Sequence, residues 1–253
     1  MSLSGDQTRA FVEGLPLPET GARYESVAGE PVAFEAAPQA VVIGAQIAQF
    51  ADSVDAETRS AIADSLLIAQ LAANKAADNS SDVLGWYRKY IEVLQNLGWI
   101  VRDLEFRDQA VSDANAGVHT AIIPVVTALL APGTAALAMV LSVLNGLKEM
   151  DSRSKWITVF DRASQHAHGA KFQLSYVDAD SVGNPVISAF CFGLLAEHTL
   201  TQVLFFKFSQ DEVTMQSANG SLSMTKEHLN AAREVIAARV RPFVADFVAN
   251  LSI

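Results

Sequence analysis

The spacing of apolar residues changes along the chain and divides it into a helical part, a strand part and a final helix. Apolar residues recur at helical spacing in several stretches before residue 170. These predicted helices cover 41–50, 55–77, 83–97 and 156–168. From Lys171 to Ser223 the chain instead holds four short stretches rich in aromatic and β-branched residues, which predict a meander of antiparallel strands. These strands cover 171–180, 185–197, 201–210 and 211–223.

Helical spacing returns at the C-terminus, where a long helix is expected from Thr225 to about Asn250, bent at Pro242. Residues 99–107 (WIVRDLEFR) fit neither period well and are expected to be an extended connection or a short strand. Because helices precede strands and one helix follows them, the fold class expected is α+β, mainly helical, with a small sheet of about four strands.

Residues 1–38 are expected to form an extended N-terminal arm. They hold four of the eight prolines and also Gly5, Gly14, Gly21 and Gly29, so a long helix is not expected there. The remaining residues, 39–253, are expected to form a single α+β domain, since half of the chain is apolar and can fill a core without cross-links.

The stretch from Ala114 to Leu147 contains no Asp, Glu, Lys or Arg. Residues 131–134 (APGT) divide it, so Val118 to Leu147 is predicted to be a central apolar helical hairpin of the buried core. At about 1.5 Å per residue each arm is roughly 20 Å long, short of the ~30 Å hydrocarbon core of a bilayer. A second interpretation is that the hairpin inserts into a membrane together with its neighbours. The residues that would then meet lipid are Ile122, Ile123, Val125, Val126, Leu129, Leu130, Leu137, Met139, Val140 and Leu141.

The charge balance narrows the choice of partners. A formal net charge of −10 and a pI near 4.9 argue against a nucleic-acid surface, which needs clustered Lys and Arg. The first residues lack a basic segment followed by an apolar one, so no Sec signal peptide is expected. We expect a chain that is cytoplasmic on synthesis, while export by a signal-independent route and association with a host membrane or lipid stay open, as does the oligomeric state.

The sequence contains no short catalytic signature. It has no G-x-S-x-G, no phosphate-binding glycine loop and no H-E-x-x-H. His166 and His168 lie two apart on a predicted helix, so their rings cannot readily share a metal, and both are expected to face solvent. We therefore expect no enzyme, no catalytic residue, no metal and no cofactor other than a possible covalent palmitate.

Cys191 is the only cysteine, so no intrachain disulfide can form. In a regular strand, Ile187, Ala189, Cys191 and Gly193 point to one face. The small residues Ala189 and Gly193 would leave room beside the sulfur. Cys191 is then either a small buried hydrophobe or the attachment point of an apolar group such as a fatty acyl thioester, in a cavity that Ile187, Ala189 and Gly193 would line.

The layout resembles the Evf-type bacterial virulence factors, on the basis of a largely helical chain of this size, a small sheet towards the C-terminus and one cysteine in the sequence SAFCFG. That resemblance implies an α/β fold in which a cysteine carries a buried palmitoyl chain as a thioester, which here would make Cys191 the lipid-attachment residue of a lipoprotein. It also implies a bacterial virulence role in an insect host, and hence an insecticidal or toxin-like protein.

Three functions follow as hypotheses. The first is a non-enzymatic virulence or toxin-like protein that acts at host membranes and carries a buried acyl chain on Cys191. The second is an α-helical pore-forming toxin whose uncharged hairpin inserts into membranes. The third is a binding module for a free apolar ligand.

Overall fold

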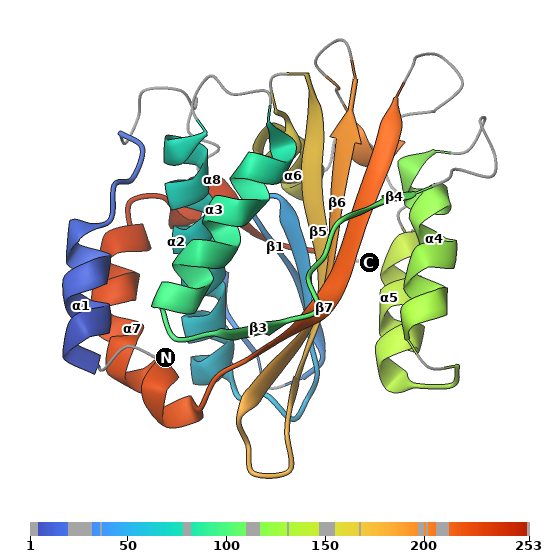
Figure 1. Ribbon diagram of the computed structural model, residues 1–253. Coiled ribbons are helices and arrows are strands. Elements are labelled where there is room, and N and C mark those ends of the chain that lie inside the picture. Colours follow the sequence, from blue (N-terminus) through green and yellow to red (C-terminus); the bar gives the residue numbers. More distant parts are fainter. Residues whose placement is uncertain are drawn as a thin grey trace.

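The computed structural model describes most of the chain, in segments. These are residues 5–19, 32–35, 37–77, 82–109, 117–130, 132–146, 155–166, 168–196, 200, 202–205 and 213–251. Within them the chain forms a central sheet with helices on both faces (Figure 1).

Among the described residues the sheet has eight strands, and most neighbours in it are antiparallel. Its order is β3-β7-β6-β5-β2-β1-β8, and β4 pairs with another part of β7. The strands are β1 (Gln39–Ile43), β2 (Gln46–Phe50), β3 (Ile100–Arg102), β4 (Arg107–Gln109), β5 (Gly169–Ala179), β6 (Pro185–Leu195), β7 (Thr214–Ser223) and β8 (Val248–Asn250). The pair β2 and β5 is parallel, with Gln46 opposite Gln173. The expected fold class is therefore wrong in its main point, because a large mixed sheet, not a set of helices with four strands, organises the molecule.

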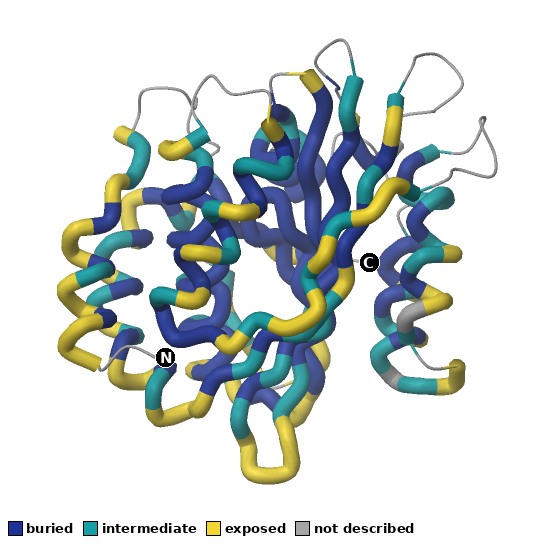
Figure 2. The backbone as a smooth tube through the Cα atoms, in the orientation of Figure 1, coloured by how far each residue is buried: buried dark blue, intermediate teal, exposed yellow. Residues whose placement is uncertain are grey.

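Two apolar cores lie on opposite faces of this sheet. One contains α1 (Gly5–Gly14), α2 (Ala56–Ala76), α3 (Val83–Asn96) and α7 (Lys226–Val240), and the other contains α4 (Val118–Leu129), α5 (Ala135–Gly146) and α6 (Lys155–Ser164). The short α8 (Val244–Phe247) precedes β8, and a turn of 3-10 helix, η2, covers Val203–Phe205. Figure 2 shows the central strands buried along nearly their whole length, as expected for a sheet covered on both faces.

The helices α2 and α3 confirm the sequence prediction at both ends. The Asp55 side chain accepts a hydrogen bond from the Thr58 amide at 2.8 Å and caps α2. Asp82 caps α3 in the same way through the Gly85 amide. Strand β3 confirms the extended character of residues 100–102, and β5, β6 and β7 confirm three of the four predicted strands.

The predicted helix over 41–50 is wrong, because this segment is the hairpin β1–β2. Its apolar residues are buried on both faces of the sheet, so they do not alternate with exposed polar residues, and their spacing also matches that of a helix. Gly44 makes the turn with φ of +56°, a conformation that favours glycine.

The C-terminal helix is shorter than expected. Helix α7 ends at Val240, before Pro242, and the residues after Phe247 form β8 along the edge of β1, with Val42 opposite Ala249.

Helix α6 is also shorter than expected and ends at Ser164 instead of His168. In the third predicted strand, 201–210, residues 203–205 form η2, and residues 201 and 206–210 lie outside the described residues.

The expected N-terminal arm is helical in part. Residues 5–14, expected to be extended, form α1, whose Val12 is fully buried in the core that includes α7. Residues 15–19 and 32–35 are irregular, while 20–31 lie outside the described residues.

The expectation of a central apolar hairpin is also wrong. Helices α4 and α5 lie outside the sheet, at one side of the molecule (Figure 1), and several of their residues are exposed. No helix in the described part of the chain is long and apolar enough to cross a membrane.

Candidate functional site

Cys191 lies in the middle of β6, opposite Gln173 of β5 and Ala218 of β7. The side chain is 2 % exposed. Ile187, Ala189 and Cys191 share the core that contains α2 and α3, whereas Phe190, Phe192 and Leu194 belong to the core on the other face. The alternation expected from the sequence is therefore present, and the thiol faces α3.

The space next to Cys191 is occupied. A Cβ atom on Gly193 would lie 3.0 Å from Cγ1 of Val83, so α3 packs directly against the small residue that was expected to leave room. The Tyr87 hydroxyl fixes this contact, because it lies 2.8 Å from the carbonyl oxygen of Phe172 and 2.9 Å from that of Phe192. Val83 and Tyr87 of α3 therefore lie against the part of β6 that was expected to leave room beside Cys191.

Burial also governs the chemistry of this thiol. It raises the pKa of Cys191 to about 12. The reactive form of a cysteine is the thiolate, so a thiol with this pKa is almost entirely in its unreactive form at neutral pH. Acylation at Cys191 stays a prediction from the sequence.

The α4–α5 pair, residues 118–146, is the second site expected from the sequence. Among the ten residues expected to meet lipid, four are buried (Ile122, Val126, Leu137 and Val140), five are half-buried (Ile123, Val125, Leu130, Met139 and Leu141), and the side chain of Leu129 lies outside the described residues. The exposed residues of the two helices and their connection are apolar or uncharged: Pro124, Thr127, Ala128, Pro132, Gly133, Ala138, Ser142 and Asn145. Neither helix contains an Asp, Glu, Lys or Arg.

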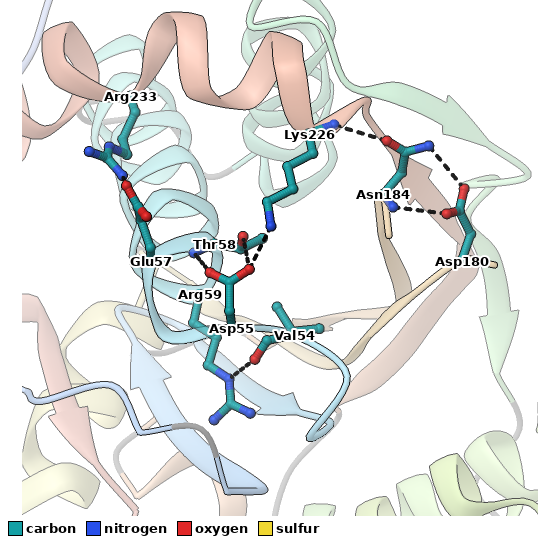
Figure 3. Close-up of polar contacts among 9 residues, drawn as sticks. All are labelled: Val54, Asp55, Glu57, Thr58, Arg59, Asp180, Asn184, Lys226 and Arg233. Carbon is teal, nitrogen blue, oxygen red and sulfur yellow. Dashed lines mark hydrogen bonds and ion pairs between the residues drawn. The ribbon is translucent and has the colours of Figure 1, made fainter. Parts of the chain in front are cut away.

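The helical layer on the opposite face of the sheet is charged in the ordinary way. Glu57 of α2 and Arg233 of α7 form an ion pair between the two helices (Figure 3). Helix α7 carries five charged residues, Lys226, Glu227, Arg233, Glu234 and Arg239. The α4–α5 pair therefore differs sharply in charge from α7 on the opposite face of the sheet.

Polar residues gather where α2 and α7 begin, beside the turn between β5 and β6 (Figure 3). Lys226 Nζ donates to Asp55 Oδ2 at 2.7 Å, and its backbone N–H donates to Asn184 Oδ1 at 3.0 Å. The backbone N–H of Asn184 in turn donates to Asp180 Oδ1 at 2.8 Å. Partial burial raises the pKa of Asp55, but hydrogen bonds from Lys226 and Thr58 outweigh it and hold that pKa at about 2. Asp55 caps a helix and Asp180 stabilises a turn, so both carboxylates have structural roles.

Sequence reasoning missed a buried cation, Lys171 at the start of β5. Its side chain is 2 % exposed, its Nζ donates to the carbonyl oxygens of Ala163 (3.2 Å) and Gln165 (3.4 Å), and it lies 4.9 Å from the centre of the Trp86 ring. Burial lowers the pKa of Lys171 to about 7. Lys171 lies on the same face of β5 as Gln173, which is the partner of Cys191 in β6. The sequence could not show this, because the pairing of β5 with β6 is known only from the structure.

His166 lies in the same region. It was expected to face solvent, but it is buried, with only 9 % of its surface exposed. Burial and, to a lesser degree, the charge of Lys171 lower its pKa to about 4, against a smaller opposing effect of Asp82. In the part of the chain that the structure describes, no three His, Cys, Asp or Glu side chains lie together as a metal site would need.

The comparisons with known proteins give distant structural neighbours. No protein-family model and no curated protein matches the sequence. Three solved structures resemble the chain at 12 % sequence identity: a delta-endotoxin (TM-score 0.40, covering 83 % of this chain and 90 % of that one), the activated Cyt2Ba monomer from Bacillus thuringiensis subsp. israelensis (0.33, 55 % and 79 %) and the Evf virulence factor (0.35, 99 % and 92 %).

These neighbours are bacterial toxins and a virulence factor, and they include the Evf protein whose family the sequence layout resembles. All three TM-scores lie below 0.5, so the likeness itself supports no function for this chain.

Proposed function

We propose that the chain is a non-enzymatic, toxin-like or virulence protein that acts at a host membrane, with α4 and α5 as the elements that meet lipid. The observation that carries this proposal is the uncharged outer surface of these two helices, described above. The virulence part of the proposal rests on the resemblance of the sequence layout to the Evf-type factors.

The physical argument concerns where uncharged helices are stable. A helix at a protein surface normally turns a charged or polar face to water, and a helix without charges is usually buried in a core or in lipid. Helices α4 and α5 contain only uncharged residues apart from His119, yet Ala128 of α4 and Ala138 of α5 are exposed. Contact with a membrane surface would cover this face.

The lengths of the helices favour contact with the interface over crossing. Each has 12 residues and is therefore about 18 Å long, short of the ~30 Å hydrocarbon core. Helices that are too short to cross can instead lie in the plane of the interface. Because the net charge is −10, we expect binding to neutral phosphatidylcholine vesicles and weaker binding when anionic lipid is added at low salt.

The test is vesicle flotation with matched glutamate variants. Ala128→Glu on α4 and Ala138→Glu on α5 each place a carboxylate on the uncharged face, and each is expected to weaken vesicle binding about tenfold, which equals about 1.4 kcal/mol. Ala231→Glu makes the same change at an exposed position of α7 and should leave binding unchanged. Absence of binding by the folded wild-type protein, or equal losses in all three variants, would refute the proposal.

Dye release from the same vesicles separates the two membrane hypotheses. Binding without release supports a protein that acts at the surface, whereas sustained release supports the pore-forming alternative.

A further inference from the structure

A cavity of about 360 Å³ lies between α2 and the C-terminal elements α7, α8 and β8. Residues 32–34 of the N-terminal segment close one side of it. Most of its wall is apolar, including Phe34, Val244 and Val248. At about 30 Å³ for each water-sized group, the cavity has room for a molecule of roughly ten non-hydrogen atoms.

Among the described residues of this wall, one is a carboxylate. Asp64 and, one helical turn before it, Ser60 line the cavity from α2. Asp64 makes no hydrogen bond or ion pair with any other described residue, and burial alone accounts for its pKa, which is raised to about 6. Arg241 also lines the cavity but is exposed, and it exerts no electrostatic effect that lowers the Asp64 pKa.

This state of Asp64 differs from that of the other acidic residues around α2. Asp55 pairs with Lys226, and Glu57 pairs with Arg233. A partly buried carboxylate with no partner is unfavourable, and a cation that donates hydrogen bonds to it removes that cost.

The surroundings of Asp64 restrict which cation fits. Calcium and magnesium need six or more oxygen ligands, and the side chains of the described lining residues offer one carboxylate and the Ser60 hydroxyl, mostly among apolar groups. An organic ammonium compound needs only one carboxylate for its nitrogen, and its hydrocarbon part gains from apolar walls.

We propose that this cavity is a binding site for a small organic ammonium compound, with the nitrogen at Asp64 and the apolar body between Phe34 and Val248. This site is separate from α4 and α5, and it does not depend on the proposed action at membranes.

The test is calorimetric titration of the full chain with 2-phenylethylamine, and with 2-phenylethanol as the neutral compound of similar shape. We expect the amine to bind at least tenfold more tightly than the alcohol at pH 7.5. Binding should weaken about tenfold at pH 5, because a carboxyl with a pKa of about 6 is then mostly protonated.

Variants distinguish binding of the amine at this site from nonspecific electrostatic attraction of the amine to the acidic protein. Asp64→Asn should remove at least nine tenths of the affinity for the amine, whereas Asp103→Asn, between β3 and β4, should leave it unchanged. Ala237→Leu narrows the cavity without altering Asp64 and should also weaken binding at least tenfold. Equal binding of amine and alcohol, equal binding by wild type and Asp64→Asn, or no heat at 10 mM amine with folded protein would overturn the proposal.

Discussion

We expect the wild-type protein to become more stable as pH rises above neutrality, and replacing Lys171 by methionine should abolish this rise. The ammonium group is buried without a carboxylate within hydrogen-bonding distance among the described residues, held by two carbonyl oxygens and the Trp86 ring. Methionine has a similar length and no charge, so Lys171→Met removes the titrating group and fills the same volume.

The magnitude follows from the pKa. The unfolded chain keeps the lysine proton up to a pKa of 10.5, whereas the folded protein keeps it only up to a pKa of about 7. Each pKa unit corresponds to about 1.4 kcal/mol, so holding the charged lysine costs the folded state up to about 5 kcal/mol at pH 7 and below. Between these two pKa values the unfolded state binds more protons, and the free energy of unfolding therefore rises with pH by up to about 1.4 kcal/mol per pH unit.

Lys171→Met should also raise stability at pH 6, by about 1 to 4 kcal/mol. The gain is smaller than the full charge cost because the variant leaves two carbonyl oxygens without their donor. Urea denaturation followed by tryptophan fluorescence measures both effects between pH 6 and pH 8.5. Above that range the Cys191 thiol adds an opposite trend, since it ionises in the unfolded chain near pH 9.0 but in the folded protein only near pH 12.

The control is Lys75→Met, at an exposed position near the end of α2, which should keep the wild-type dependence on pH. The reasoning is refuted if Lys171→Met keeps the same slope, or if it destabilises the protein at pH 6.

Three further predictions concern single residues. Asp55→Asn keeps the cap of α2 but loses the ion pair with Lys226, so the free energy of unfolding at pH 7 should fall by about 0.5 kcal/mol. The pKa of Asp55 is about 2 in the folded protein and 3.8 in the unfolded chain. The contribution of Asp55 to wild-type stability is therefore present above pH 3.8 and is lost as the pH falls through 2. Gly169→Ala, at φ of +137°, pushes a methyl group against the Leu194 carbonyl and should cost at least about 3 kcal/mol in urea denaturation. For Cys191, packed as it is here, intact mass spectrometry should give the bare polypeptide mass, and an acyl-sized excess removed by neutral hydroxylamine would instead support the acyl prediction.

The parts of the fold that follow from the sequence are those with local signals. Asp55 and Asp82 begin α2 and α3 as capping residues, and the strands β5 and β6 are long, apolar and joined by a turn with Gly183 at φ of +85°. These features depend on neighbouring residues, so the sequence contains the information needed to predict them.

The parts that escaped prediction depend on contacts between distant segments. Residues 248–250 become β8 only because the edge of β1 is there to pair with. The polar row Lys171, Gln173 and Ser175 in β5 would face water in an isolated sheet, yet all three residues are buried. The cover comes from α3, whose Tyr87 reaches the backbone of β5 and β6. No pattern in residues 169–179 could reveal that cover.

The same dependence explains why the candidate sites were only partly predictable. The uncharged character of residues 118–146 is visible in the sequence, but their position outside the sheet is not. Asp64 appears in the sequence as one acidic residue of an amphipathic helix, and the cavity beside it forms only when residues 32–34 and α8 meet α2.

The parallel pairing of β2 with β5 has a consequence for the order of folding. Strands β5 and β6 can pair through a short turn as soon as both exist, but the hairpin β1–β2 can join them only after all the intervening helices have been made. Contacts between such distant segments require closure of a long loop, and they make folding slow. The hairpin β1–β2 therefore lacks its β5 partner until residues 173–177 have formed their strand, and docking of this hairpin is the step that we expect to set the refolding rate.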